Sequence, residues 1–500
     1  MIKSRKPLFF HPAAAIVPGV IVAQIVGTIQ VYLSNAELYA KVKAISNERF
    51  LAIPNQQITP RLLEIDTAIC GGLFFALSIG AGISLLAFAA ARIWYRISSP
   101  SPRLLLLFVL IWLGFLVFIN LPGLSLLPSL YVFLIPPLVF IITVKSMPRL
   151  QRSSNLKNIM IHVMPIFILT GLWFTQYDRY LFLDLRDYLL LSSPIGKKIS
   201  DFYYNYTLYS AEVFKSQNQK LLKTVHLQDS GNLRSNRNVE KILILHDYLP
   251  VHEAGQIDLS ITGENDILSL FHRGRRILQT KTREFLSDPG TILNQFSQKC
   301  DRHANFRQIT FISLLFGYPL LLYILAHAFI WILTSWLVDT RKAAILASIL
   351  CFMISVAILV QFHMARNSSA EKMDIGRSLQ SGRWQTRVTA LRAVCEKGLE
   401  IGKYPTNLDI AKSKNIPERY WLAKALAKSR KPETYGLLLS LLEDSNPNVV
   451  SMAFSALAQR RERRAVKEIL KKIKESDNWY SQVYAYRALR ALGWTQTRSH

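Results

Sequence analysis

Cysteine is scarce in this sequence, which has four in 500 residues. Cys70, Cys300, Cys351 and Cys395 lie far apart, and none of them belongs to a CxxC pair or a Cys/His cluster. The sequence therefore predicts neither a disulfide framework nor a structural zinc site, and we expect no bound metal.

Motifs of the common enzyme classes are also missing. The sequence contains no GxxxxGK[ST] phosphate loop, no GxSxG nucleophile elbow and no HExxH zinc motif. The glycine-rich stretch GGLFFALSIGAG, 71–82, lies in an apolar run with no lysine after it, which favours close helix packing over nucleotide binding. We therefore expect no catalytic residues, no cofactor and no enzymatic activity.

Long stretches of the chain carry no charge, and 50% of its residues are hydrophobic. A membrane-spanning helix needs about 20 residues without an ionised group, so these stretches predict spanning helices. One stretch is long enough for two helices joined by a turn at NLPGLSLLPS, 120–129, which brings the total to about seven. The stretches lie between Lys6 and Glu37, Asp66 and Arg92, Arg103 and Lys145, Lys157 and Asp178, Arg307 and Asp339, and Lys342 and Arg366.

Basic residues collect on one side of the predicted helices. They occur at the N-terminus, in 92–103, in 145–157 and at 341–342, whereas the turn at 120–129 has none. The positive-inside rule then places the N-terminus in the cytoplasm, and the insertion and the C-terminal tail outside. The first apolar run is long and lacks a small-x-small cleavage site, which favours an uncleaved helix over a signal peptide. We expect a multi-pass protein of a bacterial inner membrane.

The predicted fold is mainly α: a polytopic α-helical membrane protein with a small extramembrane α+β insertion and a C-terminal α-solenoid. Its parts are a five-helix membrane segment (1–177), the insertion (178–306), a two-helix membrane segment (307–366) and the repeat domain (371–500). Within the insertion, 241–249 and 255–263 alternate like β-strands. Residues 265–286 have helical spacing, followed by a stop signal at 288–290.

The C-terminal segment repeats itself at intervals of about 32 residues, the length of a helix pair in an α-solenoid. Small and apolar residues recur in step: Ala393, Ala425, Ala456 and Ala488; Val394, Leu426, Leu457 and Leu489; and Ala390, Leu422, Ala453 and Ala485. Together with LLSLLEDSNPNV, 438–449, this pattern resembles HEAT repeats, particularly those of phycobilisome-lyase-type repeat proteins. The resemblance covers about the last quarter of the chain and implies an extended binding surface without catalytic machinery.

A run of basic residues in the tail is the candidate partner-binding site. It consists of Arg460, Arg461, Arg463, Arg464, Lys467 and Lys471. Such a run binds anionic lipid or an acidic protein, but it is equally typical of solvated outer faces of helices. We expect no nucleic acid partner, because the tail is predicted to lie outside the cytoplasm.

Histidines in the predicted spans provide a weaker alternative. His162 and His327 lie toward the same side of the membrane, where two imidazoles could hold a haem iron. A histidine bonded to a neighbouring helix is the more ordinary interpretation. Asp178, Asp184 and Asp187, just beyond the fifth span, are likewise interpreted as ion-paired with nearby arginines and not as catalytic carboxylates.

An aromatic tract, SDFYYNYTLYSAEVF at 200–214, follows that acidic segment. Phe202, Tyr206 and Tyr209 fall at i, i+4 and i+7, and Tyr203 lies beside them. No basic residue is interleaved among the rings, which argues against a base-stacking platform. We predict a helix whose aromatic side chains lie at the membrane interface.

These patterns together predict a membrane-anchored HEAT-repeat scaffold or assembly factor, in contact with membrane lipid, that docks a partner protein. The alternative is a transporter or a haem-containing redox component whose HEAT-like tail is regulatory.

Overall fold

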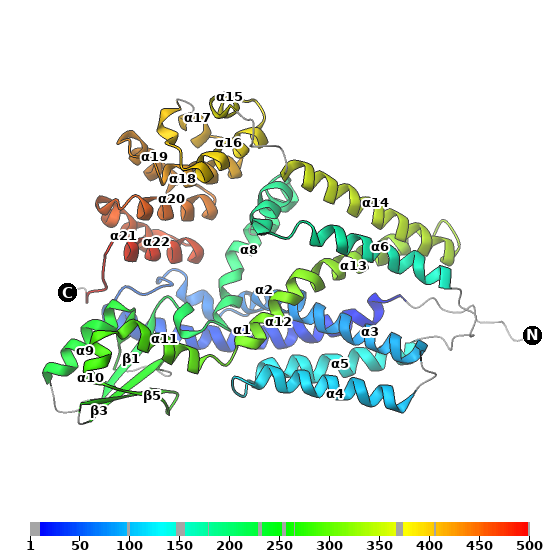
Figure 1. Ribbon diagram of the computed structural model, residues 1–500, viewed down its shortest axis with the longest axis horizontal. Coiled ribbons are helices and arrows are strands. Elements are labelled where there is room, and N and C mark those ends of the chain that lie inside the picture. Colours follow the sequence, from blue (N-terminus) through cyan, green and yellow to red (C-terminus); the bar gives the residue numbers. More distant parts are fainter. Residues whose placement is uncertain are drawn as a thin grey trace, which may run out of the picture.

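The computed structural model describes residues 11–97, 101–146, 156–178, 180–228, 233–252, 257–264, 266–366, 374–404 and 407–498. A bundle of long apolar helices, an α/β domain at one end of that bundle and an arc of short helices beside it make up the molecule (Figure 1).

The bundle consists of helices rich in apolar residues. π-helical turns at Ala76–Gly80 and Ser313–Gly317 join two pairs of them into continuous helices. The helices are α1 (Ala13–Asn47), α2 (Ile65–Phe75), α3 (Ala81–Ile97), α4 (Pro102–Asn120), α5 (Leu126–Ser146), α6 (Leu156–Phe174), α12 (Ala304–Ile312), α13 (Tyr318–Thr334) and α14 (Thr340–Arg366).

Within the described residues, six helices are long and apolar enough to cross a membrane, by length and composition. They are Ala13–Asn47, Ile65–Tyr95, Pro102–Asn120, Leu126–Ser146, Ala304–Thr334 and Thr340–Arg366. The seventh predicted stretch forms α6, whose described apolar part, Val163–Phe174, is shorter. Only 6% of the residues in the most apolar part of α4 are buried. Exposing so much apolar surface to water would be unfavourable.

Small residues bring the bundle helices close together. A Cβ atom on Gly72 would lie 2.7 Å from the backbone nitrogen of Thr28, and one on Gly27 would lie 2.9 Å from the carbonyl oxygen of Gly72. A Cβ atom on Gly80 would lie 2.3 Å from Cβ of Ala23. The glycine-rich stretch 71–82 is therefore a helix-packing surface, as predicted from the sequence.

The basic connections lie at one end of the bundle. The start of α1 and the helix ends at the α3–α4, α5–α6 and α13–α14 connections lie on the right in Figure 1, and the α4–α5 turn lies at the opposite end. The α/β domain and the arc of short helices are also on that opposite side. The basic connections that were predicted to share one side of the membrane therefore lie at the same end of the bundle.

The α/β domain contains a five-stranded sheet in the order β2-β1-β3-β4-β5. β1 pairs in parallel with β2 and β3, and β3, β4 and β5 are antiparallel. The elements are β1 (Lys223–Gln228), α9 (Leu233–Leu245), β2 (Tyr248–Pro250), β3 (Leu259–Glu264), β4 (Ile267–His272), β5 (Arg275–Lys281), α10 (Thr282–Ser287) and α11 (Pro289–Cys300).

Two secondary-structure predictions for this domain were wrong. Most of 241–249 is the end of α9, where Val239 and Leu243 are buried at helical spacing. Most of 265–286 is the β4–β5 hairpin, because Arg273 and Gly274 have φ of 48° and 77° and form a two-residue turn. Asp288 accepts a hydrogen bond from the Thr291 N–H and thereby starts α11.

α1 extends beyond the bundle into this domain. Its 35 residues span about 52 Å, more than the ~30 Å of a bilayer's hydrocarbon core. Near its end, Nζ of Lys41 lies 2.8 Å from Oδ1 of Asp258, which also accepts from Lys220 at 2.7 Å. A buried ion cluster therefore fixes the α/β domain to the bundle.

The arc of short helices forms the C-terminal part of the chain. The helices α16, α18, α20 and α22 pack on one another in succession and are called the inner helices below; α17, α19 and α21 are the outer helices. The bounds are α15 (Ile375–Leu379), α16 (Trp384–Lys397), α17 (Asn407–Ala411), α18 (Ile416–Leu426), α19 (Glu433–Leu441), α20 (Pro447–Gln459), α21 (Val466–Glu475) and α22 (Trp479–Ala491).

Candidate protein-interaction surface

The core of the arc consists of the residues that recur in the sequence. All twelve recurring positions are at most 2% exposed. They lie on the inner helices, where alanine lets neighbouring helices approach and the larger partner fills the space between them. The predicted register of the repeats is therefore the register of their packing.

An arginine links each of the first repeats to the next one. Arg387 bonds to Glu418 and donates to the carbonyl of Ser381. One repeat later, Nη2 of Arg419 lies 3.0 Å from Oδ1 of Asp444, and the same side chain donates to the carbonyl of Ser413. The arginines are 32 residues apart and play equivalent roles.

The last repeat has Gln482 at this position. Its amide donates to the carbonyl of Ser476 at 2.8 Å, and its Oε1 accepts from the backbone N–H of Asn55 at 2.9 Å. The Asn55 side chain in turn donates to three carbonyls at the end of α21, those of Ile473, Lys474 and Ser476, at 2.9–3.1 Å. The loop around Asn55, between α1 and α2, thus takes the place of a further repeat and caps the arc.

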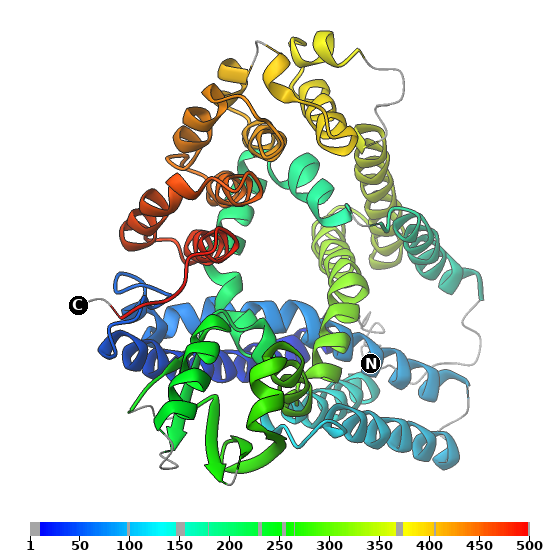
Figure 2. The same ribbon diagram turned by 60° about the vertical axis from the view of Figure 1, so that its left-hand side comes forward.

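The inner helices face a second segment of the chain. This segment consists of α7 (Leu181–Asp184), the π-helical turn Leu185–Leu190 and α8 (Pro194–Glu212), and is called the bridging segment below. Figure 2 shows it running from the N-terminal repeats toward the bundle, beside the repeat helices. The bridging segment therefore occupies part of the surface that a solenoid often uses for binding.

The acidic residues of the bridging segment are ion-paired with arginines, as predicted, but the arginines that pair with Asp184 are distant in sequence. Asp184 bonds to Arg366 of α14 at 2.9 Å and to Arg392 of α16. Asp187 pairs with the neighbouring Arg186 at 2.7 Å. Oδ2 of Asp187 also accepts from the indole N–H of Trp421 in α18 at 2.8 Å. These carboxylates hold the first repeats against the bundle.

The aromatic tract forms α8, and its rings divide between two environments. Tyr209 is 2% exposed and its ring lies 5.0 Å from that of Trp479 in α22. Tyr204 lies 4.9 Å from Tyr480. Phe202 and Tyr203 are 38% and 50% exposed, and Tyr206 is half-buried between Phe202 and Tyr209. The membrane-interface role stays a prediction for the exposed rings of Phe202 and Tyr203. Tyr209 packs against a repeat instead.

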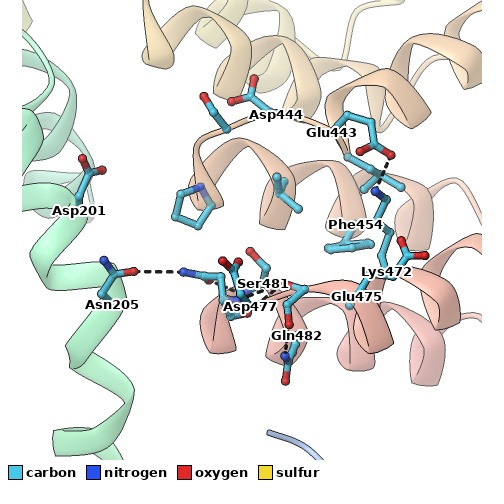
Figure 3. A pocket seen from close by; sticks show the side chains of 17 residues that line it. Asp201, Asn205, Glu443, Asp444, Phe454, Lys472, Glu475, Asp477, Ser481 and Gln482 are labelled. Carbon is cyan, nitrogen blue, oxygen red and sulfur yellow. Dashed lines mark hydrogen bonds and ion pairs between the residues drawn. The ribbon is translucent and has the colours of Figure 1, made fainter. Parts of the chain in front are cut away.

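A cavity of about 510 Å³ remains between α8 and the turns of the last repeats. Figure 3 shows its polar lining, in which Asn478 bonds to Asn205 at 3.3 Å and Lys472 pairs with Glu443 at 2.5 Å. Within the described residues no group of three acidic, histidine or cysteine side chains could hold a metal ion. The cavity is accordingly a polar gap beside the α8–α22 contact.

The predicted partner-binding residues do not form one uniform patch. The Arg460 side chain is 5% exposed, pairs with Glu462 at 2.9 Å and donates to Oγ1 of Thr434 at 2.7 Å. Arg464 also bonds to Glu462, at 3.0 Å, and its guanidinium lies 3.6 Å above the ring of Tyr435. The exposed members are Arg461, Arg463, Arg464, Lys467 and Lys471, called the basic edge below. Arg460 is thus a structural residue of the turn.

Arg461 has an unusual backbone conformation. After α16, α20 and α22 the chain makes the same hydrogen bond back to the helix, and one residue of each turn is left-handed. That residue is Gly398 (φ 66°) after α16 and Gly493 (φ 83°) after α22, but Arg461 (φ 56°) after α20. The bonds run from Leu399 N–H to Val394 O (3.0 Å), Glu462 N–H to Leu457 O (3.2 Å) and Trp494 N–H to Leu489 O (3.0 Å). An arginine therefore stands where two equivalent turns have glycine.

Further basic residues on the same edge were missed in the sequence. Lys428, Arg430 and Lys431 are exposed in the α18–α19 turn, one repeat before the basic edge. They could have been recognised from their place after the inner helix of the preceding repeat, which is also where Arg461 and Arg463 lie.

Of the two candidate haem ligands, His162 and His327, the structure describes the side chain of His327. His327 bonds through Nδ1 to Nε2 of His11 at 2.9 Å and through Nε2 to Ser348 Oγ at 3.1 Å. Both ring nitrogens of His327 are therefore engaged by other groups. The side chain of His162 lies outside the described residues.

Comparisons with known proteins agree with the repeat geometry. No curated protein and no solved structure matches the chain. The family described as HEAT repeats matches residues 404–493, which include α18–α22 and most of the linking turns. The C-terminal region of this chain therefore carries HEAT repeats.

Proposed function

We propose that the protein is a membrane-anchored scaffold that binds an acidic surface of a partner protein through the basic edge of its HEAT repeats. HEAT repeats typically serve protein–protein interaction, and a bundle with exposed apolar helices fits membrane anchoring. The bridging segment covers part of the inner helices, whereas the basic edge is exposed and available to a partner.

Arg461 is the observation that carries this proposal. A left-handed conformation costs a non-glycine residue about 1 kcal/mol, and the equivalent turns avoid that cost with glycine. A side chain that is exposed and strained contributes little to the fold. An arginine at this position is explained if its guanidinium binds something outside the chain.

Two substitutions test the proposal. Arg461→Gly should raise the free energy of unfolding by about 1 kcal/mol and at the same time weaken partner binding. Binding is followed in intact cells by photo-crosslinking from position 467, and Arg461→Glu with Arg463→Glu should abolish the crosslinked product. Lys412 and Lys414, exposed beside α17, provide the matched charge-reversal control. Crosslinking that survives reversal at 461 and 463, or is lost equally in the control, would contradict the proposal.

A further inference from the structure

A second cavity, of about 1060 Å³, lies where the bundle meets the α/β domain. It is lined by the second half of α1, the α4–α5 turn and the residues on either side of the α/β domain. Its size suits a ligand larger than a simple ion. In the proposed topology this is the external end of the bundle, where hydrocarbon gives way to water.

One wall of this cavity is apolar and exposed. Leu33, Leu124, Leu126 and Leu130 line it and are 53%, 71%, 73% and 37% exposed. These leucines continue the apolar surface of α1, α4 and α5. A bound molecule that contacts them would bury an aliphatic chain and not a polar group.

Cationic side chains outnumber acidic ones in the rest of the lining. The cations are Lys41, Lys215, Lys220, Arg273 and Arg302, and the carboxylates are Glu37, Glu212 and Asp301. Arg273 is 50% exposed although it pairs with Glu37 at 3.1 Å. Arg302 makes no ion pair within the described part of the chain, and its aliphatic stem lies against the turn at Gly123, where a Cβ atom would be 3.0 Å away. Its guanidinium is therefore positioned beside the apolar wall with its charge uncompensated.

Two buried polar atoms at the cavity lack a partner. Gln217 is 5% exposed and donates to Asp258 at 3.3 Å, but its Oε1 atom accepts no hydrogen bond. His303 also lines the cavity, and its Nδ1 is buried and unpaired. Burial lowers the pKa of His303 to about 4, so the ring is neutral at physiological pH. Buried polar groups without partners are rare, and a ligand in the cavity would satisfy both of these atoms.

We propose that this cavity binds a membrane amphiphile with an anionic, phosphate-bearing headgroup, the phosphate held by Arg302 and Arg273 and the chain lying on the leucine wall. Guanidinium groups bind phosphate oxygens through paired N–H donors. Hydroxyl groups of the headgroup can donate to Gln217. Two sources share this chemistry, a bilayer phospholipid and a polyprenyl phosphate.

The test is calorimetric titration of the full-length protein in an uncharged detergent. The ligands are short-chain phosphatidylglycerol, farnesyl phosphate, short-chain phosphatidylcholine and free glycerol phosphate. Saturable binding by either of the first two, at least tenfold tighter than by the last two, is expected. Tighter binding of phosphatidylglycerol assigns the site to a bilayer phospholipid, and tighter binding of farnesyl phosphate assigns it to a polyprenyl phosphate.

Arg302→Gln should weaken binding of the tighter ligand about tenfold or more, the effect of losing one charge-assisted bond. Arg283→Gln, an exposed substitution on α10 that does not line the cavity, is the matched control and should leave affinity unchanged. Leu124→Ser with Leu126→Ser provides a second variant that leaves the cations in place and should also weaken lipid binding. Equal affinity for phosphatidylcholine, equal affinity for glycerol phosphate, or full affinity in both variants would overturn the proposal.

Discussion

At the scale of single residues, two buried polar side chains join parts of the chain that are far apart in sequence. Asn55 connects the bundle to the last repeat, and Asp258 connects the α/β domain to α1. Neither residue belongs to a recognisable motif. Each is surrounded by partners that would be left buried and unpaired without it, which is costly.

Replacing Asn55 by alanine should destabilise the protein by about 2–3 kcal/mol, because three carbonyls at the end of α21 would lose their donor. Thermal unfolding of the purified protein measures the effect. Gln56→Ala, an exposed substitution in the same loop, should change stability little. An equal effect of both substitutions would show that the loop does not cap the repeats.

The contribution of Asp258 to the free energy of unfolding should stay constant with pH until the solution is strongly acidic. Burial opposes its ionisation, but the ammonium groups of Lys220 and Lys41 hold the pKa of Asp258 well below its ordinary value. A lowered folded-state pKa contributes stability that is present above the unfolded pKa of about 3.9 and is lost as the pH falls toward the folded-state pKa.

Asp258→Asn should therefore cost about 3–5 kcal/mol at neutral pH, since the mostly buried ammonium group of Lys220 loses its counter-ion and that of Lys41 keeps only Glu37. The difference from the native chain should shrink below pH 4. Unfolding midpoints at neutral and acid pH measure it, with the exposed Asp266→Asn as control. A difference that stays constant into acid would contradict the assigned ionisation.

At the scale of elements, the bridging segment is the link between repeats and bundle. Its start pairs with α14 and α16 through Asp184, and α8 packs Ser210 on α2 and Tyr209 on α22. The aromatic content of α8 follows from this double contact, because tyrosine buries a ring and keeps a polar end. The sequence does not show that α8 has two packing partners, so the surroundings of each tyrosine could not be predicted from it.

Asp184→Ala should loosen the first repeats, because Arg366 and Arg392 would be left without their shared carboxylate. Hydrogen exchange of α16 should become at least tenfold faster, while exchange in α22 should stay unchanged. Asp201→Ala on α8 is the control, since Asp201 is exposed. Equal acceleration in α16 and α22 would mean that the arc opens as one unit.

The elements that the sequence predicted well have strong local signals. Long charge-free stretches and a repeat with alanine at fixed positions depend on composition and period alone. The β4–β5 hairpin was mistaken for a helix because Ile267, Phe271, Leu278 and Phe285 also fit helical spacing, and the turn signal at Arg273–Gly274 was overlooked. Contacts such as Asn55 with α21 join residues more than 400 positions apart, and no local pattern encodes them.

At the scale of the whole molecule, the repeats are fastened to the bundle at three places: through Asp184, through the α8–α22 contact and through the Asn55 loop. The two ends of the arc are thus both anchored. A solenoid held in this way presents its basic edge in one fixed orientation, and it cannot rearrange around a partner as an isolated repeat array could.

The loop around Asn55 also determines how a mechanical load would pass from the repeats to the bundle. A load on a partner held at the basic edge would pass from α21 through Asn55 to α1 and α2, and from α22 through α8 to α2. Both routes end on α1 and α2, which pack closely at Gly27 and Gly72. Tension on the tail would thereby be delivered to the bundle and not to the free end of a repeat.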